Sequence, residues 1–252
     1  MRSFLLITFS ILLFSCSNNP NSNKQQVTLN YLPTSTTGQI VKHQYYTLSY
    51  NEKYEQAEWV AYQATKSHLS RAQRKRPYFI YDPLVKTKSA NYRNYKKSGY
   101  DRGHLVPAGD MRFDLDAYND TFFTSNISPQ NHKFNAGIWN RLEGKVRYWT
   151  GKYGDLYVIT GSILKPNLKK IGKEKVAVPE YFYKIILDNN GNKPKAIAFL
   201  MPNKPSEKAL YKYVVSIDEL EKKTNVDFFP TLEDELENKL EATSSYAQWS
   251  FR

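Results

Sequence analysis

The sequence predicts an α+β fold, with a mixed, mainly antiparallel central sheet flanked by helices. Runs rich in β-branched and aromatic residues recur along the chain and are clearest at 155–164, 180–188 and 195–202. One segment, from residue 135, has a long helical periodicity instead. Strands therefore dominate around one long central helix, which is typical of the α+β class. The 252 residues, 40% hydrophobic, are enough for one sizeable core.

The first residues have the layout of a secretory signal. Arg2 precedes an apolar run that ends at Phe14 and is too short to cross a membrane as a stable helix. The stretch Leu13-Phe14-Ser15-Cys16 resembles a bacterial lipobox, so we predict a lipoprotein signal peptide at 1–15 and lipidation of the Cys16 thiol. The alternative is an ordinary signal peptide with an incidental cysteine.

A polar stretch, SNNPNSNKQQ, follows this signal and cannot bury apolar surface. We predict a flexible tether over 16–39, which would leave the protein outside the cytoplasm, either anchored to a membrane by lipid alone or secreted. Cys16 is the only cysteine in the chain, so the sequence excludes an intrachain disulfide and a cysteine-rich zinc site.

A single folded domain is expected over 40–252. Its first predicted strands are 44–51 and 57–65, although the alanine and glutamine content of the second also suits a short helix. A basic segment at 70–83 ends in an Asp-Pro turn, and a polar, tyrosine-rich loop at 85–100 follows.

The stretch GYDRGHLVPAGDM, at 99–111, has neither helical nor strand periodicity. We interpret it as a shaped turn that presents ionisable groups. A strand is predicted at 121–128 and should end at Pro129.

An amphipathic helix of about four turns is predicted from Asn135. It should end near Gly151 or Gly154. Its apolar stripe consists of Ile138, Trp139, Leu142, Val146 and Trp149.

Two short capped helices are predicted near the end of the chain. The first covers 216–225, where Ser216 and Glu219 form a capping box, and the second covers 231–241. The remaining tail is expected to be peripheral.

The chain carries 36 Lys and Arg against 24 Asp and Glu, a formal net charge of +12. Such an excess favours polyanionic partners, of which nucleic acid is one, and anionic membranes and acidic glycans are others. Alternatively, it only keeps the protein soluble. The basic runs from Arg71 to Arg76 and from Lys86 to Lys97 are equally compatible with the wall of a phosphate-binding groove and with a solvated loop.

His104 is the strongest candidate for a proton acceptor. It is one of four histidines, and an unperturbed imidazole has a pKa of ~6.5, which lets it take a proton from water near neutral pH. Arg102 offers a planar fork for phosphate oxygens, and Asp101 can lock the turn or orient a neighbour. The alternative for His104 is a surface imidazole bonded to a backbone carbonyl.

Polar residues of the predicted helix can border the same cleft. The amide oxygen of Asn135 suits a hard cation such as Mg²⁺. Glu143 lies about 80° around the helix from Asn135. Glu143 and Arg147 are four residues apart and can form an ion pair, which by itself is more simply a surface pair. Asn126 can support the metal waters or the turn, although a lone asparagine before a proline turn is more often structural.

Three of these segments together resemble the DNA/RNA non-specific endonuclease family, the sugar-non-specific nucleases with a ββα-metal site. They are YDRGHLVPAGDM, SNISPQ and FNAGIWNRLEGKVR, and the resemblance spans roughly residues 57–202. DRGH alone is short, but DRGH followed about thirty residues later by N-x-x-x-W-x-x-L-E is a specific conjunction.

The resemblance implies roles for the matching residues. His104 matches the general base, Asn135 the direct protein ligand of one Mg²⁺, and Glu143 the acid that holds the metal's waters. Arg102 and Arg147 match arginines near the phosphate or leaving group, and Asn126 matches a supporting asparagine. The upstream substrate arginine has no unique alignment, and we assign it to Arg76, with Arg74 as the alternative.

One departure concerns Phe122, which stands where some members carry a further asparagine. The resemblance implies hydrolysis of DNA, with RNA also expected, to products with 5′ phosphates. The same oxygen donors also suit Mn²⁺. Two alternative functions are a nucleic-acid-binding lipoprotein without catalysis and a phosphodiesterase that acts on small or lipid diesters. Oligomeric state is left open.

Overall fold

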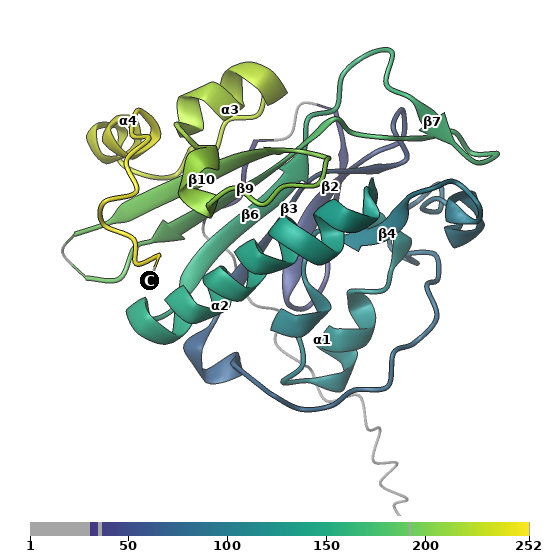
Figure 1. Cartoon of the computed structure of the whole chain (residues 1–252), viewed down its shortest axis with the longest axis horizontal. Helices are drawn as coiled ribbons and strands as arrows, with labels where there is room; N and C mark the ends of the chain where they lie inside the picture. The colour runs from purple at the N-terminus through teal and green to yellow at the C-terminus, as the bar shows by residue number, and fades with distance from the viewer. Residues whose placement is uncertain (1–30, 35–36, 192, 252) are drawn as a thin grey trace, which may run out of the picture.

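The computed structural model describes residues 31–34, 37–191 and 193–251. Within them the largest sheet has seven strands, all paired antiparallel, which confirms the predicted α+β class (Figure 1). Its order is β1 (Gln39–Lys42), β2 (Tyr46–Asn51), β3 (Gln56–Ala64), β6 (Leu156–Ser162), β9 (Tyr181–Asp188), β10 (Lys195–Pro202) and β11 (Val214–Val215).

The sheet separates two hydrophobic cores, because successive side chains of a strand point to opposite faces. In β3, Val60 and Tyr62 join one core, whereas Trp59 and Ala61 join the other. Helix α2 (Asn140–Tyr153) covers the first face. The helices α3 (Ile217–Thr224) and α4 (Asp234–Glu241) cover the second. The long helix therefore lies on the side of the sheet opposite the two short C-terminal helices.

The capping chemistry explains where the C-terminal helices begin. Ser216 Oγ accepts a hydrogen bond from the Glu219 backbone N–H at 3.1 Å, as the predicted cap requires. Helix α3 ends at Asn225, whose φ of 55° takes the backbone out of the helix. Helix α4 begins later than predicted, because the carboxylate of Glu233 serves as its cap.

The sequence prediction was wrong about the DRGH stretch. Residues Asp101–His104 form a strand, β4, that pairs antiparallel with β5 (Ile127–Gln130). A π-helical turn (Phe134–Trp139) then leads directly into α2, so β4, β5 and the helix form a ββα unit. Gly103 has no side chain, and this leaves room for the side chain of Gln130 on the partner strand. Because the other residues of β4 are Asp, Arg and His, the strand has no apolar periodicity.

The predicted strand at 121–128 was also misplaced. Helix α1 (Leu115–Asp120), capped by Asp114 Oδ1, precedes a 3₁₀ turn at Thr124–Asn126. The strand starts only at Ile127, and Pro129 lies inside it opposite Arg102. Proline lacks an N–H, so it is tolerated where the ladder does not require that donor. The sheet containing it has only two strands among the described residues.

Several short elements carried no sequence signal. They are the strands β7 (Lys170–Ile171) and β8 (Val176–Ala177) and the 3₁₀ turns Lys66–His68, Tyr92–Tyr95, Ala108–Asp110 and Leu210–Tyr213. Each is too short for an amphipathic period to be recognised. The 57–65 segment, in contrast, is the strand β3 and not a helix.

The C-terminal tail is not peripheral, contrary to prediction. Trp249 is only 4% exposed, and its ring centroid lies 4.7 Å from that of Trp149 on α2. Trp149 in turn donates its indole N–H to the Ser250 carbonyl at 2.7 Å. The tail therefore closes the end of the first core.

The N-terminal part of the described chain also packs against the sheet. Thr34 donates its backbone N–H to the Asp227 carbonyl at 2.9 Å, and the ring of Tyr31 lies 4.6 Å from that of Tyr157. These two residues fall within the predicted tether over 16–39 and are nevertheless part of the fold. The predicted signal peptide and Cys16 lie outside the described residues. Among the described residues, no helix has the length and apolarity needed to cross a bilayer.

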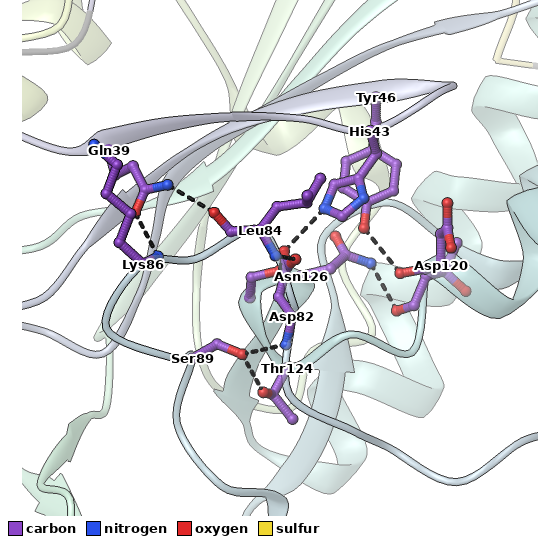
Figure 2. Close-up of polar contacts among 12 residues, drawn as sticks. Gln39, His43, Tyr46, Asp82, Leu84, Lys86, Ser89, Asp120, Thr124 and Asn126 are labelled. Atoms are coloured by element: carbon purple, nitrogen blue, oxygen red, sulfur yellow. Dashed lines mark hydrogen bonds and ion pairs between the residues drawn. The ribbon is translucent and has the colours of Figure 1, made fainter. Parts of the chain in front are cut away.

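A buried polar network attaches the extended segment around residue 82 to the sheet (Figure 2). The Asp82 carboxylate contacts His43 Nε2 at 2.9 Å and accepts from Ser125 Oγ at 2.5 Å. Burial alone would raise the pKa of Asp82, but these hydrogen bonds and the charge of His43 lower it. Ser89 connects the Asp82 backbone N–H to Thr124. The network therefore joins three segments that are distant in sequence, around residues 43, 82 and 125.

Candidate active site

A cleft of about 790 Å³ opens beside the ββα unit. Four of the residues singled out in the sequence line it together: His104 from β4, Asn135 from the π-helical turn, and Glu143 and Arg147 from α2. A neighbouring pocket of about 570 Å³ also includes Asn135 and is lined by Arg76 and Arg102. Asn126 lines neither pocket.

His104 lies between two aromatic rings at the end of β4. The Phe122 ring meets the imidazole edge to face at 4.9 Å, and the Phe79 ring is 5.7 Å away. The His104 Nε2 atom is buried and has no hydrogen-bond partner in the described part of the chain. Burial, and secondarily the charge of Arg76, lower the pKa of His104 to about 3. The imidazole is therefore neutral and keeps an unused nitrogen lone pair.

Asn135 is oriented by a carboxylate from the preceding strand. Its Nδ2 donates to Asp101 Oδ2 at 2.9 Å, and the same oxygen lies 3.0 Å from His132 Nδ1. Because an amide carries its nitrogen and oxygen on opposite branches, this bond directs the Asn135 oxygen away from Asp101. The amide oxygen is thus presented as an acceptor beside the cleft, which is the donor type that a hard cation prefers.

Glu143 faces the cleft above a lysine that is completely buried. Lys184, on β9, donates to Thr160 Oγ1 at 2.5 Å and lies 5.0 Å from the centre of the Trp139 ring. Burial raises the pKa of Glu143, and the charge of Lys184 opposes that rise. Burial lowers the pKa of Lys184, and the charge of Glu143 opposes that decrease. Each charge therefore favours the ionised form of the other.

Arg147 does not pair with Glu143 as the helical spacing predicted. Its Nη1 donates to Asp110 Oδ1 at 2.6 Å, and the second oxygen of Asp110 accepts from the Tyr62 hydroxyl at 2.7 Å. The Asp110 side chain is only 5% exposed, so its carboxylate requires both partners. The ion pair connects α2 to the turn after β4 and orients the guanidinium at the cleft wall.

The three arginines predicted to bind phosphate differ in what their guanidinium groups contact. The guanidinium of Arg76 lies over the rings of Phe79 and Phe122, next to His104. The guanidinium of Arg102 lies 5.0 Å from the centre of the Phe79 ring. Arg74 instead donates to the carbonyls of Arg112 and Phe113, so its guanidinium is engaged with the backbone. Between the two alternatives, the geometry favours Arg76.

Asn126 is a structural residue with no exposed surface. Its Oδ1 accepts from the Val106 N–H at 2.8 Å, and its Nδ2 donates to the carbonyls of Val106 and Thr121. Two of these bonds are made to Val106, two residues after His104, so Asn126 supports the site by holding that backbone. It does not reach the cleft.

Sequence reasoning missed Asp110 and Lys184 as members of the site. Asp110 lies within the quoted GDM stretch but has no short-range partner. Lys184 is the single charged residue within the apolar run YFYKIIL, and a lysine in a strand that is otherwise apolar is a usable signal of a buried ionic contact. Arg147, which pairs with Asp110, lies 37 residues further along the chain. Glu143, which interacts with Lys184, lies on a different element. Sequence spacing alone could therefore not identify these contacts.

The model of the DNA/RNA non-specific endonuclease family matches residues 23–235 of this chain. The chain belongs to this family. It is 37% identical over 224 residues to mitochondrial nuclease EXOG of Danio rerio, covering 82% of this chain and 65% of that protein. It is 33% identical over 232 residues to nuclease C1 of Cunninghamella echinulata, covering 85% and 91%.

A solved structure has the same architecture. The crystal structure of the EndoG/EndoGI complex superimposes with a TM-score of 0.73 at 29% identity, covering 78% of this chain and 87% of that chain. The chain spans 56% to 65% of the length of the EXOG nucleases from Danio rerio, Xenopus laevis and Mus musculus.

The predicted location of the protein is contradicted by these relatives. The sequence predicted an extracytoplasmic protein that is lipid-anchored or secreted. The EXOG proteins and the Saccharomyces cerevisiae relative, 31% identical over 243 residues, are named mitochondrial nucleases. A short apolar leader does not by itself specify one destination, and this explains the error.

Proposed function

We propose that this protein is a metal-dependent endonuclease that hydrolyses phosphodiester bonds of DNA and RNA without sequence preference. The observation that carries the proposal is that one cleft is lined by a neutral imidazole, an oriented amide oxygen, a carboxylate and a guanidinium. These groups are His104, Asn135, Glu143 and Arg147. Family membership supports the same reaction class.

His104 is proposed as the general base. It accepts a proton from a water molecule on its free Nε2 as the water oxygen attacks phosphorus, and the bond from phosphorus to the 3′ oxygen breaks. The products are a 5′ phosphate and a 3′ hydroxyl, whose proton comes from solvent. Burial and the charge of Arg76 keep the pKa of His104 low. A bound phosphate would raise that pKa, because a nearby negative charge favours the imidazolium.

The donor set of the cleft fits a divalent cation with a preference for oxygen. We propose that the Asn135 amide oxygen binds Mg²⁺ directly and that Glu143 holds the ion through water, with Mn²⁺ as an alternative suited to the same donors. Asp101 fits this role by fixing the amide in one orientation. When bound, the cation would stabilise the negative charge that develops on the phosphate and on the departing oxygen.

The arginines are proposed to bind phosphate oxygens. Arg147 lines the catalytic cleft, and Arg102 and Arg76 line the adjoining pocket. That pocket also contains Arg93, Lys96 and Lys97, which belong to the basic loop that the sequence left undecided between a groove wall and a solvated loop. Its position next to Asn135 supports the groove wall. Contacts to backbone phosphates carry no sequence information, so this pocket favours cleavage without sequence preference.

The test is digestion of plasmid DNA, single-stranded DNA and RNA with Mg²⁺, with and without EDTA. We expect the wild type to cut all of them, EDTA to abolish cleavage, and His104→Ala to lose activity by at least ~100-fold. His132→Ala is the comparison variant, because His132 is exposed and does not line the cleft that contains His104. Binding of nucleic acid without cleavage by the wild type, or preferential hydrolysis of a small diester, would contradict the proposal.

The role of the basic pocket has a separate test. Cleavage should slow steeply between ~50 and ~300 mM NaCl, because each neutralised phosphate releases counterions on binding. Replacing Lys96 and Lys97 together with Ala should weaken this salt dependence. A rate that is independent of salt in the wild type would argue that the basic loop is only a solvated surface.

A further inference from the structure

A second cluster of ionisable groups lies on the opposite face of the sheet from the cleft. It is formed by five carboxylates: Asp218 and Glu221 on α3, Asp227 in the following turn, and Glu237 and Glu241 on α4. They form two triads, and Glu241 belongs to both. Within each triad the oxygens lie within 4.8 Å of one another.

Glu241 is the centre of this cluster, and it is buried. Only 7% of its surface is exposed, and its Oε1 atom is completely inaccessible and has no hydrogen-bond partner among the described residues. Glu237 Oε1 is likewise buried and has no hydrogen-bond partner among the described residues. A buried carboxylate oxygen with no donor is strongly disfavoured, so some group that the described chain does not supply must satisfy it.

No basic side chain of the described part of the chain forms an ion pair with the cluster. Burial raises the pKa of Glu241 to about 8, and the negative charges of Glu221, Glu237, Asp227 and Asp218 act in the same direction. Among the described residues, the Phe228 backbone N–H donates to Glu221 Oε1 at 2.8 Å. Either protons or a cation must therefore offset the repulsion between the carboxylates.

We propose that this cluster binds one Ca²⁺ ion, with Glu241 as its central ligand. Ca²⁺ accepts six to eight oxygen ligands at ~2.3–2.6 Å, so oxygens on opposite sides of the ion are ~4.6–5.2 Å apart. The oxygens of the triads have a compatible spacing. Mg²⁺ fits less well, because it requires ligands at ~2.0–2.1 Å and keeps several of its waters.

The ion would join three separate segments of the fold. It would bind α3 to α4 and would include Asp227, whose backbone carbonyl accepts from Thr34. The site is structural, because α3 and α4 pack on the core opposite the one that α2 covers. Calcium binding at this position should therefore stabilise the folded protein without taking part in hydrolysis.

The experiment measures the thermal unfolding of the full chain after removal of metals, at pH 7.5, with and without CaCl₂. Asn135→Ala serves as the background, so that binding at the catalytic cleft does not contribute. We expect Ca²⁺ to raise the Tm by about 5–10 °C when its concentration is a hundredfold above the dissociation constant. Calorimetric titration of the same protein with CaCl₂ should give one site.

Two substitutions in this background test the ligands. Glu241→Gln and Glu221→Gln keep the side-chain shape and should abolish the Tm shift and the calorimetric site. Glu219→Gln is the matched control, because Glu219 is also on α3 but pairs with Lys223 at 3.6 Å outside the cluster. It should keep the full shift. If Glu241→Gln does not fold, the Tm shift and the calorimetric titration of Glu221→Gln are sufficient to test the proposal.

Three results would overturn the proposal. The first is no change in Tm with Ca²⁺, and the second is a shift that survives both cluster substitutions. The third is stabilisation by acidification from pH 7.5 to 6 in place of stabilisation by Ca²⁺, which would mean that protons offset the repulsion. None of these results bears on the nuclease, because the Mg²⁺-dependent activity of Glu241→Gln should equal that of the wild type.

Discussion

The side-chain amide of Asn135 donates a 2.9 Å hydrogen bond to the carboxylate of Asp101, across 34 residues of sequence. Asp101 is the first residue of β4, whereas Asn135 lies in the π-helical turn before α2. The bond therefore connects the strand that carries His104 to the helix that carries Glu143. It also fixes which atom of the amide is available to a cation.

Asp101→Ala should weaken metal-dependent cleavage without removing any proposed ligand. Without its acceptor the Asn135 amide can rotate, and loss of such an orienting partner typically costs ~10–100-fold in metal affinity or activity. The measurement is the cleavage rate as a function of Mg²⁺ concentration, which should show a raised requirement for the ion. His132→Ala removes the other, more exposed contact of Asp101 and should change little. Equal effects of the two variants would contradict the orienting role.

Lys184→Met should shift the acidic limb of the pH–rate profile to higher pH. The Lys184 charge opposes the rise in the pKa of Glu143 that burial causes, so its removal raises that pKa further. Since the proposed role of Glu143 requires the carboxylate form, we expect a shift of about one pH unit, equivalent to ~1.4 kcal/mol.

Lys195→Met is the control for this substitution. Lys195 lies on the adjacent strand, where its ammonium group lies 3.4 Å from the centre of the Tyr153 ring, and it does not line the cleft. Its replacement should leave the acidic limb in place. An unchanged limb in Lys184→Met itself would show that Lys184 only fills space beneath the helix.

Gly103→Ala should destabilise the ββα unit. A Cβ at this position would lie 2.2 Å from Cδ and Oε1 of Gln130, which is fully buried on the partner strand. The cost should be ~1–3 kcal/mol, as for other overpacked sites, measured by urea unfolding. Gly144→Ala is the control, because its Cβ would meet nothing closer than 3.9 Å and α2 should gain ~0.5–1 kcal/mol. Similar stabilities for the two variants would contradict this account of β4.

His104→Gln should make the protein less sensitive to acid. The pKa of His104 is lowered from ~6.5 in the unfolded chain to about 3 in the fold. Between these values only the unfolded state takes up the proton, so the wild type loses ~1.4 kcal/mol of stability for each pH unit below 6.5. The free energy of unfolding of the variant relative to that of the wild type should therefore rise by ~2 kcal/mol between pH 6.5 and 4.5. A constant difference would show that His104 is protonated in the native state.

Local patterns in the sequence were sufficient for the main elements. The apolar runs of β6, β9 and β10 are long, and each is buried on both faces of the sheet, so their strand character is visible without tertiary information. The apolar stripe of the predicted helix is also recognisable from the sequence, and its members, in the π-helical turn and α2, are buried in the first core. The family resemblance implied a ββα unit, but local patterns did not reveal its first strand, because β4 has only four residues and is held by Gly103 packing against Gln130.

The sequence by itself determined the family, the strand-dominated class and four polar residues of the cleft, His104, Asn135, Glu143 and Arg147, because residue type and periodicity are local properties of a chain. Only the tertiary structure decided the partners: Asp110 for Arg147, Lys184 beneath Glu143, Asp101 for Asn135, and the two phenylalanine rings beside His104. A periodic pattern specifies which face of an element is buried, but not which element covers it. Charges and hydrogen bonds at a site depend on that second choice, since they act between atoms that the fold brings together from distant positions.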